Sequence, residues 1–200
     1  MSQYFENDKN VKHQIRMLQY EYGKYNFDFY SDNGVFAKDG VDFGSKLLIE
    51  MFVKNNQKGY ILDVGGGVGV ISIVLSKVLE CNSDMVEINQ RALDLAFKNI
   101  KLNGVSNSVK AMYSDAYENV EQYYDFVVTN PPIRAGKKVV YSILFGAFNH
   151  LKEDGELWFV MRKNHGADSA MKDLKEKDII CEVVKKDKGF FIIKAKKVRN

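Results

Sequence analysis

The residues best suited to chemistry in this chain are Asn130-Pro131-Pro132, which directly follow the apolar run Tyr124–Thr129. Proline fixes φ and lacks a backbone N–H, so this segment is expected neither to continue a sheet nor to turn into a helix. If the apolar run is a parallel strand, the Asn130 side chain and nearby free carbonyls are held at the carboxyl edge of the sheet, where open α/β folds bind ligands. Such acceptors could grip the hydrogens of a planar –NH2 group while another group is transferred to its nitrogen.

A glycine-rich loop is the second candidate element, in the sequence Asp63-Val64-Gly65-Gly66-Gly67-Val68-Gly69. Glycines let a backbone approach a ligand closely, and the helix expected after the loop offers free N–H groups. Glu87 ends the next apolar run, 24 positions after Asp63. A carboxylate there can accept hydrogen bonds from two ribose hydroxyls. The pattern predicts a nucleoside-containing cofactor, bound by Gly65, Gly67, Gly69, Glu87 and the adjoining Ile88.

The glycines alone do not decide which cofactor this is, because a single glycine cluster is a weak signal. Neither Gly65 nor Gly67 begins a complete G-x-G-x-x-G, and no Gly-Lys-Ser/Thr follows as in a P-loop. Asp63, two residues before the first glycine, favours a cationic group over a pyrophosphate, so S-adenosylmethionine fits better than NAD. Asp63 would help orient its methionyl ammonium. Asp115 could accept from the adenine amino group, and the Ala116 N–H could donate to a ring nitrogen.

Methyl transfer matches the chemistry expected of the Asn-Pro-Pro segment. An amine on a base is a poor nucleophile because its lone pair is delocalised into the ring. Hydrogen bonds to the Asn130 side-chain oxygen and the Pro131 carbonyl would favour sp3 character and aim the lone pair at the methyl group. The sulfonium is already a good leaving group, so positioning is enough, without a metal or a strong base. Cys81 and Cys181 have no Cys or His neighbours in sequence, and no metal site is expected.

Alternating strands and helices must position these residues. A β-hairpin is expected from Tyr20–Tyr22 and Tyr25–Tyr30, and a helix follows Val41–Ser45 through about Val53. From residue 60 the alternation predicts a Rossmann-like, doubly wound, mainly parallel sheet that ends in an antiparallel hairpin. The expected strands are Tyr60–Val64, Asp84–Ile88, Val109–Tyr113, Tyr124–Thr129, Glu156–Met161, Ile179–Lys185 and Phe190–Lys196. The expected helices are Val70–Leu79, Gln90–Leu102, Val139–Leu151 and Ala167–Lys177.

The length and the charge of the chain indicate its domain count and its class of partner. Two hundred residues fit one domain, with residues 1–40 as a hairpin extension and 41–200 as the core. No apolar run reaches the ~18 residues of a membrane span and no signal peptide is evident, so a cytoplasmic protein is expected. The net charge is +3, but residues 163–200 carry eleven Lys/Arg against six Asp/Glu, a local excess of five. Together with the basic segment Arg134–Lys138, this indicates either a polyanionic partner or a solvated surface.

The segments Asp63–Gly69, Glu87–Asn103, Ser114–Ala116 and Asn130–Pro132 resemble the successive motifs of class I SAM-dependent methyltransferases that act on amino groups. More narrowly, the chain resembles small, single-domain relatives of the 16S ribosomal RNA guanine-N2 methyltransferase RsmC. This similarity spans nearly the whole chain, from about residue 4. It is closest in Ser31–Phe36, Val41–Ser45, Asn130–Lys138 and Phe191–Lys197.

The resemblance implies a seven-stranded sheet, S-adenosyl-L-methionine as cofactor, and a ribosomal RNA base as substrate, free or in the small ribosomal subunit. It also implies that Phe36, Asp42 and Gly44 lie near the methionyl end of the cofactor. Many amino-methyltransferases carry an aromatic residue in the fourth position of the motif, to stack on the flipped base, where this chain has Ile133. RsmC has two methyltransferase-like domains and this chain has room for one. Its RNA contacts must therefore come from elsewhere, and the candidates are the N-terminal hairpin and Ile133, Arg134, Lys137 and Lys138.

Other functions stay open at this point. Methylation of a glutamine amide in a protein such as a release factor also uses Asn-Pro-Pro, although usually with an aromatic fourth residue. Adenine-N6 methylation of nucleic acid is a third acceptor chemistry. Outside this class stand a catalytically inactive SAM-binding module and a nucleotide-dependent oxidoreductase. Titration with SAM and with NAD separates the last of these from the rest.

Overall fold

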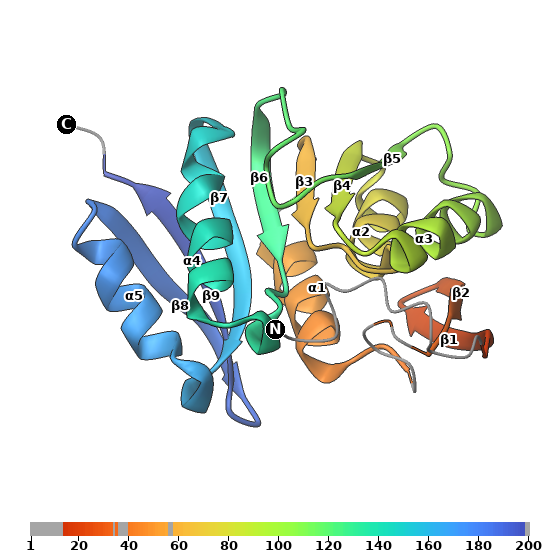
Figure 1. The fold of residues 1–200 in the computed structure, drawn as a ribbon, viewed down its shortest axis with the longest axis horizontal. Helices are drawn as coiled ribbons and strands as arrows, with labels where there is room; N and C mark the ends of the chain where they lie inside the picture. Colours follow the sequence, from red (N-terminus) through yellow and green to blue (C-terminus); the bar gives the residue numbers. More distant parts are fainter. Residues whose placement is uncertain (1–13, 34, 36–39, 56–57, 199–200) are drawn as a thin grey trace.

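The computed structural model describes residues 14–33, 35, 40–55 and 58–198. Within them, seven strands form one sheet in the order β5-β4-β3-β6-β7-β9-β8 (Figure 1). Strands β3 to β7 run parallel, and β9 is antiparallel to both of its neighbours. The predicted mainly parallel, seven-stranded sheet with a C-terminal antiparallel hairpin is therefore confirmed. The strands are β3 Ile61–Val64, β4 Ser83–Glu87, β5 Val109–Tyr113, β6 Tyr124–Thr129, β7 Leu151–Arg162, β8 Ile179–Asp187 and β9 Phe190–Lys197.

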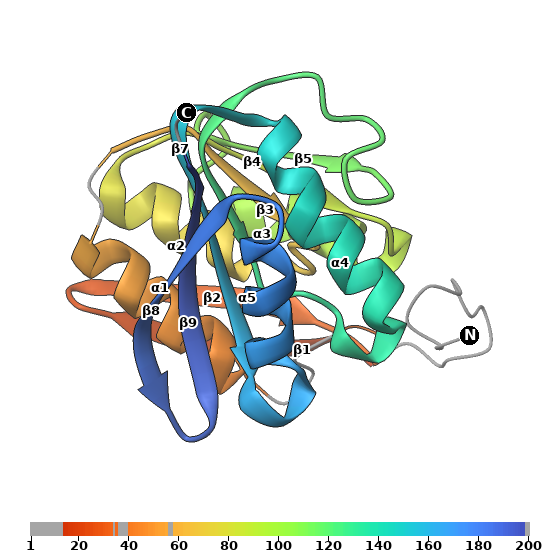
Figure 2. The same ribbon diagram turned by 90° about the vertical axis from the view of Figure 1, so that its left-hand side faces the viewer.

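Helices cover both faces of the sheet, which buries the alternate side chains of its strands in two separate cores. Figures 1 and 2 show α4 and α5 on one face, with α1, α2 and α3 on the other. In the core under α1, the Trp158 ring packs edge-on against Phe52, with ring centroids 5.4 Å apart. The helices are α1 Phe43–Asn55, α2 Val70–Leu79, α3 Gln90–Leu102, α4 Lys137–Gly146 and α5 Ala167–Lys175.

The N-terminal hairpin, β1 Arg16–Tyr22 and β2 Tyr25–Ser31, forms a second, two-stranded sheet. Two asparagines, one in α3 and one directly after it, satisfy the outer edge of β2. The Asn99 side chain accepts from the Tyr30 N–H at 2.7 Å and donates to the Tyr30 carbonyl at 3.0 Å, and Asn103 pairs with the backbone of Asp28 in the same way. Asn99 also donates to the Val68 carbonyl at 2.9 Å, so the hairpin is tied to the glycine loop through one buried side chain.

The structure corrects several predicted boundaries. The helix expected over Val139–Leu151 ends earlier, because α4 stops at Gly146, a 3-10 turn follows at Ala147–Asn149, and Leu151 already belongs to β7. The predicted strand Glu156–Met161 is correspondingly too short. The N–H of Tyr124 donates to the His150 carbonyl at 2.8 Å, which draws this segment into the sheet despite the left-handed Asp154 (φ 68°). The β8–β9 turn contracts to Lys188-Gly189, both with positive φ, so β8 extends to Asp187.

Candidate functional site

The carboxyl ends of β3 and β6 meet at one edge of the sheet. Asp63 of β3 is in register with Met85 of β4 and with Val128 of β6. The Thr129 hydroxyl donates to the Val64 carbonyl at 2.7 Å, which fixes the end of β6 against the end of β3. Because Asn130 is the next residue, the Asn-Pro-Pro segment leaves the sheet directly beside the glycine loop.

The glycine loop is held by its own backbone and leaves one side open. The N–H groups of Gly65 and Gly66 both donate to the Val86 carbonyl, at 2.9 and 3.1 Å. Gly65 and Gly67 have positive φ (72° and 58°), and a Cβ added to either would meet nothing within 4 Å. A Cβ at Gly66 would instead lie 2.9 Å from the Met85 side chain, so Gly66 is the tightly packed position of the loop. The loop thus forms a cradle that side chains at 65 and 67 would begin to fill.

Asp63 is a buried acid beneath this cradle, only 1% exposed. Its Oδ2 accepts from the backbone N–H of Ser72 at 3.2 Å and from the Ser72 hydroxyl at 2.7 Å. Burial raises the pKa of Asp63 to about 7, with the charge of Glu87 acting in the same direction and the two Ser72 hydrogen bonds opposing it. The carboxyl is therefore close to half-ionised at neutral pH, and a cation beside it would favour the ionised form.

Glu87 ends β4 and is also 1% exposed. Its Oε2 accepts from the Gly67 N–H at 2.9 Å and its Oε1 from the Asn89 N–H at 2.8 Å. These two bonds, one to each carboxylate oxygen, fix the direction of the carboxylate. The neighbouring Ile88 is half-buried.

The end of β5 is more open. The Asp115 side chain is exposed, while Ala116 is half-buried and takes a left-handed conformation with φ 46°. The buried Ser114 hydroxyl accepts from the Asn119 N–H at 3.0 Å and so turns the chain at this point. Tyr117 lies on the face of the sheet that α4 covers. Its hydroxyl donates to the Ile143 carbonyl of α4 at 2.7 Å.

The Asn130 amide has a defined orientation. Its Nδ2 lies 3.2 Å from Asp42 Oδ1 and 3.0 Å from Ser45 Oγ. An ionised carboxylate can only accept hydrogen bonds, so the nitrogen end of the amide must face Asp42, and Oδ1 points the opposite way. Asp42 is fixed in turn, because the same Oδ1 accepts from the Ser45 N–H at 3.0 Å at the start of α1. Asn130 is half-buried, and the two contacts of its amide nitrogen fix the direction of its carbonyl oxygen.

The residues after Asn130 form a short, partly buried turn. Pro131 is buried, Pro132 and Ile133 are half-buried, and a 3-10 turn begins at Ile133, directly after the prolines. Arg134 and Lys138 are exposed. Lys137 differs from them, because its Nζ lies 3.4 Å from Asp173 Oδ2 of α5 and 4.5 Å from the centroid of the Tyr141 ring. The basic segment is thus divided between two outward cations and one that contacts the protein.

Three side chains of this edge were not expected from the sequence to take part in it. Ser45 holds Asn130, Ser72 holds Asp63, and Thr129 fixes the end of β6. Ser72 and Thr129 stand next to recognised motifs, so their positions gave a usable signal, whereas Ser45 is 85 residues from its partner. Gly44 is packed, since an added Cβ would lie 3.1 Å from both Asp42 Oδ1 and the Phe190 ring. Phe36, expected near the cofactor, lies outside the described residues.

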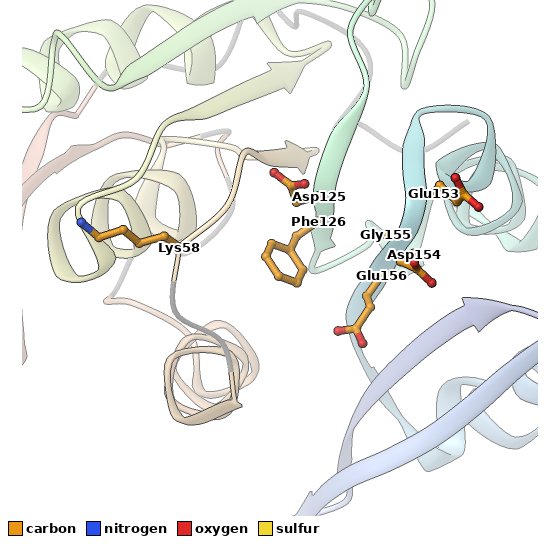
Figure 3. A pocket seen from close by; sticks show the side chains of 7 residues that line it. All are labelled: Lys58, Asp125, Phe126, Glu153, Asp154, Gly155 and Glu156. Carbon is orange, nitrogen blue, oxygen red and sulfur yellow. The ribbon is translucent and has the colours of Figure 1, made fainter.

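A hollow at the opposite end of the sheet is lined mainly by acidic side chains. Its volume is about 320 Å³, and it lies between the start of β6 and the first half of β7. Figure 3 shows Asp125 and Phe126 on β6, with Glu153, Asp154 and Glu156 along β7. Lys58 is the basic residue of this lining. This hollow lies at the other end of the sheet from the edge where Asn130 and the glycine loop meet.

In the part of the chain that the structure describes, no group of three or more His, Cys, Asp or Glu side chains is placed to hold a metal ion. Cys81 and Cys181 are free cysteines there, buried and half-buried respectively. Among the same residues, no helix combines the length and the apolar character needed to cross a membrane.

Comparison with known proteins gives this edge its context. The family model of the methyltransferase small domain matches residues 26–194, a range that includes the glycine loop and the Asn-Pro-Pro segment. The chain belongs to this family. It is a class I SAM-dependent methyltransferase related to RsmC, and its cofactor is S-adenosyl-L-methionine.

Its relatives within the family differ in length. The chain is 44% identical to the uncharacterized protein YbxB of Bacillus subtilis (strain 168), over 99% of this chain and 100% of that one. It is 32% identical to the ribosomal RNA small subunit methyltransferase C of Aliivibrio salmonicida, over 76% of this chain but 45% of that protein. The fold matches the solved structure of T. thermophilus RsmC in complex with AdoMet and guanosine, with a TM-score of 0.81 at 20% identity, over 92% of this chain and 51% of that one. The chain thus spans about half the length of the RsmC proteins that it resembles.

Proposed function

We propose that this methyltransferase transfers a methyl group to the exocyclic amine of a nucleic acid base, and that the base is guanine, methylated at N2 in small-subunit ribosomal RNA. The observation that carries the proposal is the Asn130 amide. Its nitrogen end is occupied by Asp42 and Ser45, which leaves its oxygen to accept a hydrogen bond from an incoming amino group.

The cofactor side of the edge fits S-adenosyl-L-methionine. Gly65 and Gly67 leave the space that a Cβ would begin to fill, so the backbone can lie against a ligand. Glu87 would accept from the ribose hydroxyls, with the direction of its carboxylate set by the N–H groups of Gly67 and Asn89. Asp63 would favour the methionyl ammonium by its charge, acting from beneath the loop. Asp115 and the Ala116 N–H would contact the adenine, and Asp42 and Gly44 would border the methionyl end.

Bound S-adenosyl-L-methionine supplies a methyl group on a sulfonium that leaves as a neutral thioether. The Asn130 Oδ1 and the Pro131 carbonyl would accept the two amine hydrogens and localise the nitrogen lone pair. As the new N–C bond forms and the C–S bond breaks, the nitrogen becomes positive and gives up one proton. The acceptor oxygen that is hydrogen-bonded to this proton would pass it towards solvent. Rigid acceptors supply catalysis here by positioning and by a fixed dipole, since neither group has to move.

Ribosomal RNA is favoured as the acceptor by the relatives and by the charge around the site. Proteins 30–34% identical to this chain over 64–76% of its length are ribosomal RNA small subunit methyltransferases. The exposed Arg134 and Lys138 follow the Asn-Pro-Pro segment directly and suit a phosphate backbone. Ile133 would cover the base by apolar contact. Lys137 would act mainly by holding α4 against α5. The core of residues 41–200 would carry the reaction, with the hairpin of residues 1–40 as an extension.

The test is methyl transfer from tritiated SAM to four acceptors measured side by side. These are 30S subunits from cells in which the gene is deleted, the protein-free 16S RNA extracted from them, double-stranded DNA and a release factor. We expect label in the 30S subunits or in their RNA. Label confined to the release factor would instead support glutamine methylation, and label in DNA would support adenine-N6 methylation. SAM binding without transfer to any of the four would indicate an inactive module and contradict the proposal.

A further inference from the structure

The turn between β8 and β9 lies at the same end of the sheet as the first turn of α1 (Figures 1 and 2). Phe43, the first residue of α1, and Phe190, the first residue of β9, meet there with ring centroids 5.5 Å apart and planes tilted by 51°. Each ring carries a cation. The Lys188 Nζ lies 4.7 Å from the centroid of the Phe43 ring, and the Arg162 guanidinium lies 4.6 Å from the centroid of Phe190.

This cluster is built into the elements that hold Asn130. Phe43 stands between Asp42 and Gly44 in the chain, and Asp42 and Ser45 are the two partners of the Asn130 amide. The Phe190 ring lies so close over Gly44 that an added Cβ would be 3.1 Å from it. The cluster therefore packs directly against the segment that holds the Asn130 amide.

The two cations face outward. Arg162 and Lys188 are exposed, whereas both rings are half-buried against the core under α1. Within the described part of the chain, neither cation has a carboxylate within ion-pairing distance. The turn is held rigidly, because the Lys163 N–H at the end of β7 donates to the Gly189 carbonyl at 2.9 Å. The turn that carries Lys188 is thereby tied to the end of β7.

We propose that Phe43, Phe190, Arg162 and Lys188 form the binding platform for the single-stranded segment of RNA that flanks the target base. Alternating rings and cations suit this ligand, since bases stack on aromatic faces or guanidinium planes while the cations neutralise phosphates. This inference rests on the proposed function, because it assigns the substrate of the same site.

The two chemical parts of the platform predict different effects on RNA binding. Replacing a cation that neutralises a phosphate lowers the salt dependence of binding, by about 0.7 in the slope of log K against log salt for single strands. Replacing a stacking ring weakens binding on the order of tenfold while leaving the slope unchanged. Lys186 provides a matched control. It also lies 4.6 Å from a ring centroid, that of Phe191, in the same hairpin, but that ring belongs to the core on the other face of the sheet.

The experiment measures the binding of a fluorescent single-stranded fragment of 16S RNA by anisotropy, from 50 to 200 mM salt, together with SAM affinity by calorimetry. We expect R162Q/K188Q to bind RNA about tenfold more weakly, with a reduced salt slope, and F190L to bind more weakly with an unchanged slope. K186Q should match the wild type, and all variants should keep wild-type SAM affinity.

If R162Q/K188Q binds RNA as K186Q does, the platform is wrong and the proposed function stands. If the wild type itself binds no RNA, the proposed substrate fails and the platform with it. The glutamine variants alter exposed side chains, so the result does not depend on whether F190L folds.

Discussion

The glycine-loop side and the Asn130 side of the candidate site differ in how their polar groups are satisfied. On the glycine-loop side, the two acids are buried and bonded to backbone or to a neighbouring serine. On the Asn130 side, the amide is held from behind by Asp42 and Ser45, and exposed cations surround it. The first arrangement fixes a recess for one small molecule. The second presents a single fixed acceptor next to an open, positively charged surface, which suits a large and variable polymer.

The largest effect should come from removing the fixed acceptor. Asn130→Ala is expected to lower turnover by about a hundredfold or more, because a hydrogen bond that strengthens in the transition state is lost. SAM affinity should stay within several-fold, since the amide belongs to the acceptor side. Steady-state kinetics and calorimetry measure the two quantities separately. Asn82→Ala, at an exposed position between α2 and β4, is the matched control and should behave as the wild type. Normal turnover in Asn130→Ala would remove this residue from the mechanism.

Substitutions on the cofactor side should lower SAM affinity more than turnover. Glu87→Ala leaves the N–H groups of Gly67 and Asn89 without their acceptor. The hydrogen bonds from the ribose hydroxyls to the carboxylate would also be lost, and a hydrogen bond to a charged group is worth about 1.5–3 kcal/mol, so SAM affinity should fall by about tenfold or more. Glu87→Gln keeps one acceptor oxygen and should show a smaller loss. The comparison fails if calorimetry finds wild-type SAM affinity in Glu87→Ala, because the ribose would then be held elsewhere.

The pH dependence of SAM binding should separate Asp63 from the other acids. Burial raises its pKa to about 7, so the ligand-free protein binds a proton below that pH. A cationic ligand favours the ionised form, and affinity should therefore rise between pH 6 and 7.5, by up to about tenfold per unit. Higher pH is avoided, since an α-amino group has a pKa of about 8. The same raised pKa means that the stability this group gives the ligand-free fold is present below pH 4 and is lost as the pH rises to 7.

Asp63→Asn is the control for this pH profile. It cannot titrate, so its SAM affinity should be flat over the same range. A wild-type profile that is equally flat would mean that Asp63 holds the loop through Ser72 without sensing the charge of the ligand.

The smallest effects should come from the exposed cations after the Asn-Pro-Pro segment. Arg134→Gln and Lys138→Gln should each raise the KM for 30S subunits or RNA a few-fold and lower the salt slope by about 0.7 per phosphate contact. Lys58→Gln, beside the acidic hollow at the other end of the sheet, should change neither quantity. Equal effects of Lys58→Gln and Arg134→Gln would indicate that net charge acts on RNA binding irrespective of position.

Local patterns were enough to predict most of the elements of this fold. Helix α3 and strands β5 and β6 begin and end where periodicity and turn residues indicate, because each has an unbroken pattern and a clear stop. The prediction was wrong between Gly146 and Glu156. Apolar residues there continue a helical spacing, and the polar segment before Glu156 resembles a turn. Only pairing with β6 draws Leu151 into the sheet, and that pairing is not encoded locally.

The candidate site likewise has some residues that local sequence predicts and some contacts that it does not. Strand-end residues such as Asp63, Glu87 and Asn130 could be selected from the sequence, because each follows an apolar run and parallel strands end at one edge. Their supporting contacts could not be predicted, since Asn130 meets Ser45 across 85 positions. The cluster of Phe43 and Phe190 is also invisible in sequence, because α1 and β9 lie at opposite ends of the chain.

The most direct test of the central claim is to identify the labelled nucleoside. Subunits lacking the modification would be incubated with tritiated SAM and either wild-type protein or Asn130→Ala, and their 16S RNA digested and separated by chromatography with mass detection. The account predicts tritium in N2-methylguanosine with the wild type. With the variant, the rate at which this label appears should fall by about a hundredfold or more. Label in another nucleoside or in ribosomal protein, or equal labelling by both proteins, would contradict it.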